Sequence, residues 1–248
     1  MAAHFVRQRW LDGTYARLAW VTIPDPQLVD TVAASGRFDA VVIDVQHGPF
    51  HQQAILDAVR AAGRWPVTLL ARIASPDADL IGWILDAGVD GVIVAMCESV
   101  DDAERIVRAV RYAPEGSRSY GVYRVQPTDH DPFAAADEAI VLPMIESAAG
   151  LQHAAAIAAV AGVDGLFIGP GDLGLSLGHG VGQNRTEPAM VEAFATIRSA
   201  AAQFDRRCGI FATTADYARQ TAAEGFDIVV PWVDAPAIAA SLAAASMP

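Results

Sequence analysis

The chain has 248 residues, 53% of them hydrophobic, which suits one large α/β domain or two small ones, and no Pro/Ser-rich linker favours two. Its 17 basic and 29 acidic residues give a formal net charge of −12, and no basic run forms a patch for phosphate backbones. We therefore expect no nucleic-acid partner. An anionic small molecule can bind only where a local cation or metal overcomes the repulsion of the whole protein.

The beginning of the sequence and its cysteines bear on localisation. The segment MAAHFVRQRW lacks the apolar centre of a signal peptide, and no stretch reaches the roughly 18 consecutive apolar residues that a spanning helix requires. Cys97 and Cys208 each stand beside an apolar run, where thiols are more often buried and reduced than bridged. We expect a soluble, cytoplasmic protein with no membrane partner.

Short apolar, β-branched runs recur along the chain, and each is followed by a longer Ala-rich segment of helical period. This alternation is typical of repeated βα units. The eight expected strands cover residues 18–23, 40–44, 67–72, 91–96, 139–146, 165–170, 208–212 and 228–233.

The runs are apolar on both faces, which predicts parallel strands covered on each side. Eight such units close into a (β/α)8 barrel, an α/β fold that we expect to form a single domain over residues 1–248. A doubly wound open sheet is the alternative. It normally shows a glycine-rich dinucleotide fingerprint after its first strand, and the segment WVTIPDP at 20–26 is not one.

Two connections, 97–138 and 171–207, are long. In the first we expect a helix over 99–114, with Ser99 as its cap and Pro114 at its end. Long loops after the fourth and sixth strands of a barrel lie on its catalytic face, so we expect loops 116–133 and 174–188 to set specificity. The tail APAIAASLAAASMP is a helix with almost no charged face, which indicates the last barrel helix or a subunit interface.

Polar side chains stand at the carboxyl ends of the expected strands, which in a barrel meet at one mouth. In chain order they are Trp20, Asp44, Gln46, His47, Arg72, Glu146 and Asp172.

Glu146 and Asp172 follow neighbouring strands, and two carboxylates facing one cavity repel each other. A hard divalent cation relieves that repulsion and leaves positions for water and substrate. Alternatively, each residue caps the helix that begins beside it. For the two together we favour a metal site.

Arg72 ends an apolar strand, where its guanidinium can hold an enolate or carbonyl oxygen, or can form a structural ion pair with Asp44 or Asp77. His47 is a candidate for proton transfer, although a lone histidine in a loop is usually only solvated. Its place directly after a strand and before Gly48 favours the catalytic role.

The segments IDVQHGP, LLARI, LDAGVDGVIVAM, VRYAPEGSR, LPMIES and FIGPGDLGLSLG together resemble the HpcH/HpaI aldolases, the metal-dependent class II pyruvate aldolases. The resemblance runs in order from about Trp20 to Trp232. It implies a (β/α)8 barrel that binds Mg, Mn or Co and is usually a hexamer with an exchanged terminal helix. It also implies reversible cleavage of a 4-hydroxy-2-oxo acid to pyruvate and an aldehyde.

Carried over by position, the resemblance implies metal ligation by Glu146 and Asp172 and enolate stabilisation by Arg72. It implies that His47 is the base, oriented by Asp86, often from the neighbouring subunit. The amides of Gly171 and Asp172 receive the pyruvate carboxylate, with Trp20 also in the substrate site and Asp44 and Gln46 in support. The chain contains no lysine, which excludes a Schiff-base class I aldolase.

Two positions depart from the family pattern. Many members carry Glu where this chain has Gln46, and Gln where it has Met144. These changes leave two alternatives open beside an aldolase: a decarboxylase of an oxaloacetate-type acid that uses the same enolate, and a non-catalytic barrel that only binds a 2-oxo acid.

Overall fold

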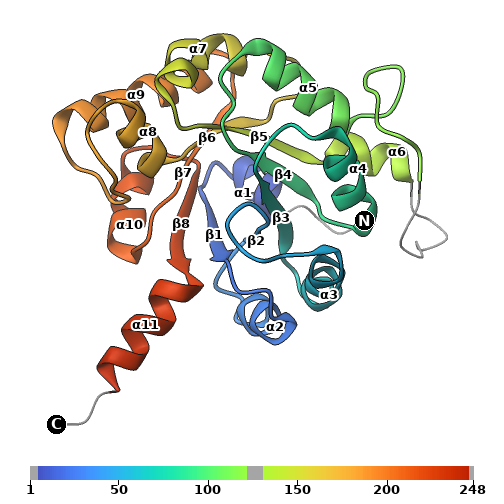
Figure 1. Cartoon of the computed structure of the whole chain (residues 1–248), viewed down its shortest axis with the longest axis horizontal. Coiled ribbons are helices and arrows are strands. Elements are labelled where there is room, and N and C mark those ends of the chain that lie inside the picture. The colour runs from blue at the N-terminus through green and yellow to red at the C-terminus, as the bar shows by residue number, and fades with distance from the viewer. Residues whose placement is uncertain (1–4, 122–130, 246–248) are drawn as a thin grey trace.

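Eight parallel strands close into a barrel in chain order, which confirms the predicted (β/α)8 architecture (Figure 1). The computed structural model describes residues 5–121 and 131–245. Each predicted run overlaps its strand, with bounds that differ by at most two residues. The strands are β1 Ala16–Val21, β2 Ala40–Asp44, β3 Thr68–Ile73, β4 Gly91–Val94, β5 Ile140–Ile145, β6 Gly165–Ile168, β7 Arg207–Ile210 and β8 Ile228–Val233.

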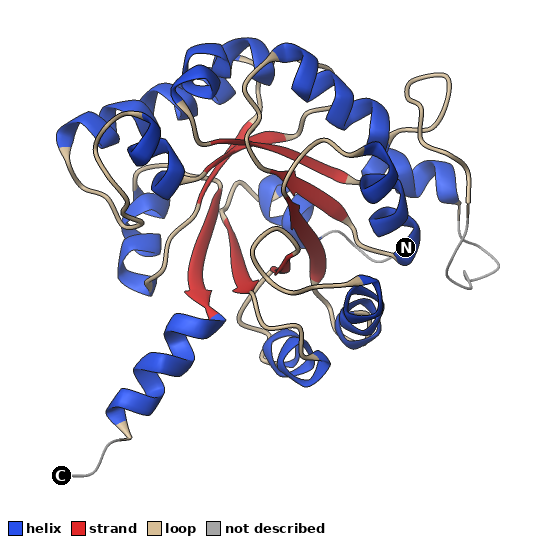
Figure 2. Cartoon of the chain, viewed as in Figure 1, coloured by secondary structure: helices blue, strands red, loops and turns tan. Residues whose placement is uncertain are grey.

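Helices form the outer layer around this barrel (Figure 2). They are α1 Phe5–Leu11, α2 Pro26–Ala34, α3 Gln52–Ala62, α4 Ala78–Ala87, α5 Val100–Val110, α6 Pro132–Glu138, α7 Ala148–Ala158, α8 Pro170–Ser176, α9 Pro188–Gln203, α10 Ala215–Ala223 and α11 Asp234–Ala244. Among the helices of described residues, none is both long and apolar enough to cross a membrane.

The strands are apolar on both faces because alternate side chains enter two separate cores. On β2, for example, Val42 packs inside the barrel, whereas Val41 and Ile43 pack against the helices. The same alternation on β5 places Met144 inside the barrel. Both cysteines are free and buried in the outer core, as predicted.

Helix α1, which the sequence did not reveal, closes the amino end of the barrel. Its Val6 and Trp10 belong to the inner core. Arg9 Nε donates to Asp39 Oδ1 at 2.8 Å, just before β2. The opposite, carboxyl end is thereby the open one.

The first long connection departs from the prediction at its end. Ser99 caps α5 as expected, since its Oγ accepts from the amide of Asp102. The helix stops at Val110, short of Pro114, and the short helix α6 was not predicted. Loop 116–133 includes residues 122–130, which lie outside the described part of the chain.

Helix α11 leaves the barrel instead of packing along it (Figure 1). Only its first residue, Asp234, is buried, while Ile238 and Leu242 are exposed. Within the part of the chain that is described, no helix of the same molecule covers its apolar sides.

Asp234 fastens the start of α11 to the loop after β1. Its carboxylate accepts from the amides of Thr22 at 2.7 Å and Ile23 at 2.8 Å, and from the Thr22 hydroxyl at 2.8 Å. The side chain has no exposed surface. Buried donors that lose such an acceptor are costly to leave unpaired.

We predict that Asp234→Ala lowers the free energy of unfolding by about 2 kcal/mol, because two partly buried amides and the Thr22 hydroxyl lose a charged acceptor. Urea denaturation measures this change. The control is Asp216→Ala, whose exposed carboxylate pairs only with Arg219 on α10, with an expected change within about 0.5 kcal/mol. Equal effects for the two variants would contradict the anchoring role.

Candidate active site

The mouth of the barrel gathers the polar side chains that follow the inward register of the strands. Trp20 is in the inner core, and Asp44, Arg72 and Glu146 continue the inward register of β2, β3 and β5. All four are buried. The predicted convergence of strand-end residues is therefore observed for these four.

Asp44 and Arg72 form an ion pair across adjacent strands. The two residues are register partners on β2 and β3. Arg72 Nε donates to Asp44 Oδ1 at 3.0 Å and Nη2 donates to Oδ2 at 2.6 Å, a bidentate arrangement. This is one of the two structural pairs considered for Arg72; the other candidate, Asp77, instead caps α4.

Asp44 also accepts from two further donors. The Trp20 indole donates to Oδ2 at 3.0 Å, and the backbone amide of His47 donates to Oδ1 at 2.9 Å. Burial by itself raises the pKa of Asp44, but the hydrogen bonds and charge of Arg72 outweigh it and hold the pKa below its usual value. The carboxylate is thus ionised and fully occupied in orienting its neighbours.

The guanidinium of Arg72 keeps part of its donor capacity free. Nη1 donates to Gln46 Oε1 at 2.6 Å, and the ring of Trp20 lies 5.6 Å from Cζ. Of the five N–H groups, three have acceptors among the described residues, which leaves one on Nη1 and one on Nη2. A fixed cation with two free donors can hold a substrate oxygen.

Glu146 lies on the other side of the mouth in surroundings that disfavour its charge. Burial raises its pKa to about 7, and the nearby charge of Asp172 adds to the rise. Its Oε1 accepts from the amide of Met96 at 2.8 Å. A Cβ at Gly169 would come within 2.4 Å of Oε2, so only glycine allows β6 to end against this carboxylate.

The helix-capping alternatives fail for both acids. Helix α7 is capped by Ser147, whose Oγ accepts from the Gly150 amide at 3.1 Å, which leaves Glu146 free. Asp172 is exposed in the first turn of α8, and that helix has no side-chain cap. The amides of Gly171 and Asp172 lie in the same turn, where helix amides lack partners within the helix.

Glu146 and Asp172 suit a hard divalent cation. They are oxygen donors from adjacent strand ends, and the raised pKa of Glu146 indicates a carboxylate that lacks a compensating charge. Among the described residues, no group of three or more His, Cys, Asp or Glu is placed to hold a metal. Mg²⁺ is commonly bound by one or two carboxylates together with water and substrate oxygens, so a two-carboxylate set fits.

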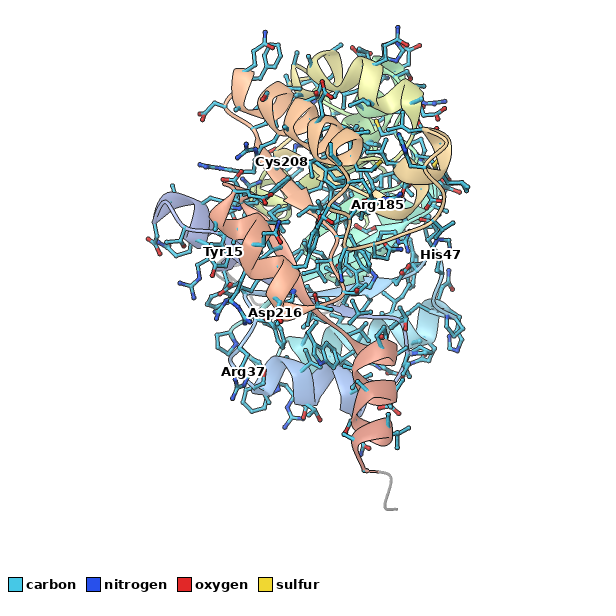
Figure 3. All side chains as sticks on the ribbon, turned by 90° about the vertical axis from the view of Figure 1, so that its left-hand side faces the viewer. Tyr15, Arg37, His47, Arg185, Cys208 and Asp216 are labelled. Carbon is cyan, nitrogen blue, oxygen red and sulfur yellow. The ribbon has the colours of Figure 1, made fainter. Side chains whose placement is uncertain are left out.

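His47 lies exposed in the loop that follows the carboxyl end of β2, at the edge of the molecule in the view of Figure 3. Its backbone is fixed by Asp44, and the loop is packed tightly. A Cβ at Gly48 would come within 2.5 Å of the Asp44 carbonyl oxygen and 2.6 Å of that of Thr22. The backbone of His47 is thereby fixed just after the carboxyl end of β2, while its side chain is exposed.

Asp86 does not contact His47 within the chain. It lies on α4, where it pairs with Arg118, whose guanidinium stacks 4.8 Å from the ring of Tyr112. Contact between Asp86 and a histidine of a neighbouring subunit stays a prediction. Trp20 is 1% exposed and supports Asp44 from below, and its contact with substrate likewise stays a prediction.

Met96 is a site residue that the sequence did not reveal. Its backbone lies in the left-handed region with φ of 53°, which costs a residue with a side chain about 1–2 kcal/mol. In this conformation its amide reaches Glu146. No local sequence pattern predicts this conformation for a methionine, because glycine is the usual residue in the left-handed region.

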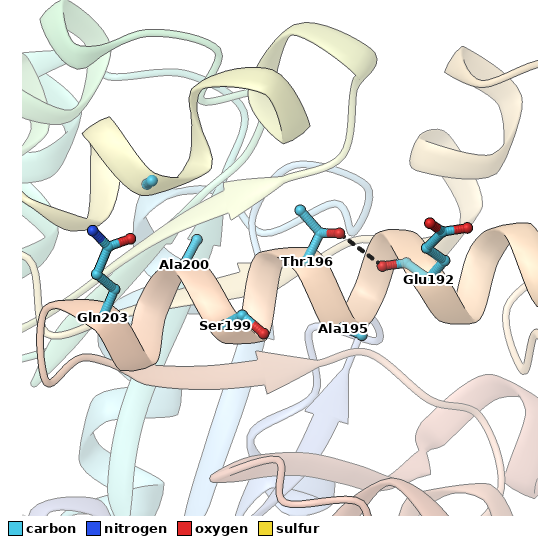
Figure 4. Close-up of a pocket in the computed structure, with 7 residues that line it drawn as sticks. Glu192, Ala195, Thr196, Ser199, Ala200 and Gln203 are labelled. Atoms are coloured by element: carbon cyan, nitrogen blue, oxygen red, sulfur yellow. Dashed lines mark hydrogen bonds between the residues drawn. The ribbon is translucent and has the colours of Figure 1, made fainter.

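A surface cavity of about 460 Å³ lies away from the mouth (Figure 4). It is lined mainly by α9, including Glu192, Thr196 and Gln203, with Ala155 from α7. These residues are on the outer helical layer and take no part in the site.

A (β/α)8 barrel with an arginine, two carboxylates and a histidine at the carboxyl ends of its strands is the architecture of an enzyme with its active site at the mouth. The chain belongs to the HpcH/HpaI aldolase/citrate lyase family, whose model matches residues 17–239, and is accordingly an aldolase-type carbon–carbon lyase. The predicted family is confirmed.

Individual relatives cover nearly the whole chain. The hydroxypyruvate/pyruvate aldolase of Rhizorhabdus wittichii is 37% identical, over 95% of this chain and 94% of its own. The 4-hydroxy-2-oxovalerate aldolase of Rhodococcus jostii is 31% identical, over 87% and 84%. The crystal structure of a HpcH/HpaI aldolase/citrate lyase family protein from Burkholderia cenocepacia superposes with a TM-score of 0.90 at 27% identity, covering 98% of each chain.

The raised pKa of Glu146 predicts that the metal-free protein loses stability as the pH rises. In the unfolded chain this carboxyl ionises near pH 4.5, but in the folded protein only near pH 7. The folded state therefore binds more protons between these values, and the free energy of unfolding falls by roughly 2–3 kcal/mol from pH 5 to pH 8.

Urea denaturation at both pH values, after dialysis against a chelator, measures this loss. Glu146→Gln keeps the shape of the side chain and removes the titrating group, so we expect its loss to be smaller by the same amount. Equal losses in the two proteins would show that Glu146 titrates normally.

Proposed function

We propose that the protein is a divalent-metal-dependent aldolase that reversibly cleaves a 4-hydroxy-2-oxo acid to pyruvate, or a related 2-oxo acid, and an aldehyde. The observation that carries this proposal is the division of the mouth into two halves. One half holds Arg72 with two free donors, and the other holds the unneutralised carboxylates Glu146 and Asp172. The printed names of the relatives, which are pyruvate and 4-hydroxy-2-oxo acid aldolases, support it.

Glu146 and Asp172 hold the cation, which we propose to be Mg, Mn or Co, because hard oxygen ligands accept all three. When bound, it draws electron density from the 2-oxo group of the substrate. The amides of Gly171 and Asp172 bind the carboxylate of the 2-oxo acid. In a protein of net charge −12, these amides and Arg72 supply positive potential where an anion must bind.

Arg72 stabilises the charge that develops during cleavage. Its free N–H groups donate to the 2-oxo oxygen as that oxygen becomes an enolate, and Asp44 and Gln46 prevent the guanidinium from turning away. Gln46 keeps the hydrogen bond without adding a second anion. The positive potential at Arg72 is consequently less neutralised than it would be beside Glu at this position.

His47 moves the proton. It removes the proton of the 4-hydroxyl, the C3–C4 bond breaks with its electron pair going to C3, and the aldehyde leaves. The enolate then takes a proton at C3 to give pyruvate, and addition follows the same steps in reverse. Asp86 of a second copy of the chain orients His47.

A decarboxylase of an oxaloacetate-type acid is the second candidate, since it needs the same enolate. The positive potential at Arg72, which the neutral Gln46 does not reduce, favours enolate formation whichever group leaves. Met144, which is 3% exposed in the inner core, contributes apolar surface below Glu146. It has no polar group that would favour one of the two reactions.

We predict that chelator abolishes cleavage and that Mn, Co or Mg restores it. Glu146→Ala and Asp172→Ala each lower kcat/KM by more than about 100-fold, because the polarisation of the 2-oxo group is lost. Deuterium exchange into the methyl group of pyruvate, followed by NMR, reports enolate formation without an aldehyde. Asp216→Ala, on the surface of α10, is the control and keeps the activity.

Three results would decide between the candidates. Full activity in chelator would overturn the metal-dependent aldolase. Release of carbon dioxide from oxaloacetate faster than release of aldehyde from a hydroxy-oxo acid would favour the decarboxylase. Binding of pyruvate and metal without methyl-proton exchange would indicate a protein that binds a 2-oxo acid without catalysing a reaction.

The enzyme works as a homo-oligomer, a hexamer or a trimer-based assembly, in which α11 packs on a neighbouring copy. Support comes from the exposed apolar residues Ile238 and Leu242 on a helix that leaves its own barrel. Burial of such an apolar helix face against a partner stabilises the assembly. The other partners are the small-molecule 2-oxo acid and aldehyde, and the buried free thiols suit the reducing cytoplasm.

We predict that Ile238→Asp with Leu242→Asp reduces the molar mass in solution, measured by light scattering after size exclusion, because charges enter the covered face. The control is Leu11→Asp, which places a charge on a residue that is 81% exposed at the closed end of the barrel. An unchanged mass for the α11 variant would contradict the role of this helix in assembly.

A further inference from the structure

Met96 combines three features that a structural role does not require together. It has a positive φ of 53°, its amide donates to Glu146, and its apolar side chain is 45% exposed. The hydrogen bond alone needs only a backbone N–H. Glycine would supply that without strain.

The residues on either side fix the backbone at Met96. Ala95 is tied to β3 through the Ile73 carbonyl at 2.9 Å, and Cys97 is tied to β5 through the Met144 carbonyl at 3.1 Å. Both are fully buried, at 0% and 1% exposed. Met96, between these two buried residues, is 45% exposed. It lies just after the carboxyl end of β4, with its amide on the carboxylate of Glu146.

The only other residue with a side chain at positive φ among those described is Asp205, with φ of 54°. It follows α9 before β7, at the closed end of the barrel. Aspartate accepts this conformation comparatively well, because its short polar side chain bonds locally. Methionine has no such compensation, and strained backbones of this kind cluster at functional sites.

We propose that the side chain of Met96 is a wall of the site for the aldehyde and contacts the apolar chain of the aldehyde substrate. This inference rests on the proposed aldolase function. The bond that forms or breaks joins the aldehyde carbon to the 2-oxo acid, which is bound between Arg72 and the cation that Glu146 and Asp172 would hold, so the aldehyde chain extends from there toward the rim. A flexible, polarisable thioether at the rim fits chains of different length.

The test compares aldehydes within each variant. In the addition of pyruvate with metal present, kcat/KM is measured for butanal and for formaldehyde, and their ratio is taken. Met96→Gly keeps the amide for Glu146 and removes the wall, and we expect this ratio to fall about tenfold, the effect of losing contact with a few methylene groups. A general loss of activity cancels in the ratio.

Two further variants make the result decisive. Met96→Asn tolerates the left-handed backbone but presents a polar group, so its ratio also falls and shifts toward hydroxylated aldehydes such as glycolaldehyde. Asp205→Gly relieves the same backbone strain far from the mouth and leaves the ratio unchanged.

The possible failures are distinguishable. A ratio within twofold of the wild type in both Met96 variants, with methyl-proton exchange of pyruvate intact, overturns this inference alone. Absence of exchange in the wild type overturns the proposed function and this inference with it. A changed ratio in Asp205→Gly attributes the effect to strain and also overturns the inference.

Discussion

The buried ion pair between Asp44 and Arg72 is the interaction on which the active site depends. Two charges taken out of water are costly unless every lone pair and N–H finds a partner. Asp44 meets this condition with four bonds, from Arg72, Trp20 and the His47 amide, and these bonds orient three groups at once. Because the carboxylate is satisfied from within the protein, two N–H groups of Arg72 remain without an acceptor among the described residues.

In the half of the mouth that contains Glu146, by contrast, the protein does not satisfy the carboxylate charge. Glu146 has one amide donor, a buried position and an acidic neighbour in Asp172, so its charge is left for something else to balance. One side of the barrel therefore presents donors and the other presents acceptors. The proposed 2-oxo acid together with a cation would satisfy both sides, whereas the carboxylate half by itself repels an anion in so acidic a protein.

The sequence predicted the barrel because each strand carries its own apolar, β-branched run, and it predicted the meeting of Asp44, Arg72 and Glu146 because strand ends converge by topology. It did not predict contacts that depend on backbone conformation or on distant segments. The left-handed Met96 contradicts local preference, and α1 closes the barrel through side chains that carry no distinctive pattern. For Asp86 the sequence suggested only His47 as a partner. Its observed partner, Arg118, is one of many arginines, and no local pattern shows that a loop brings this one close to Asp86.

The protruding helix and the loop that carries His47 both contact the loop after β1. Asp234 begins α11 and holds the amides of Thr22 and Ile23, and the carbonyl of Thr22 presses against Gly48, next to His47. A glycine is required at that point because any side chain would separate the two loops. A displacement of α11 at its base would therefore reach the His47 loop through these close backbone contacts, so the position of His47, the proposed base, depends on how the C-terminal helix is held.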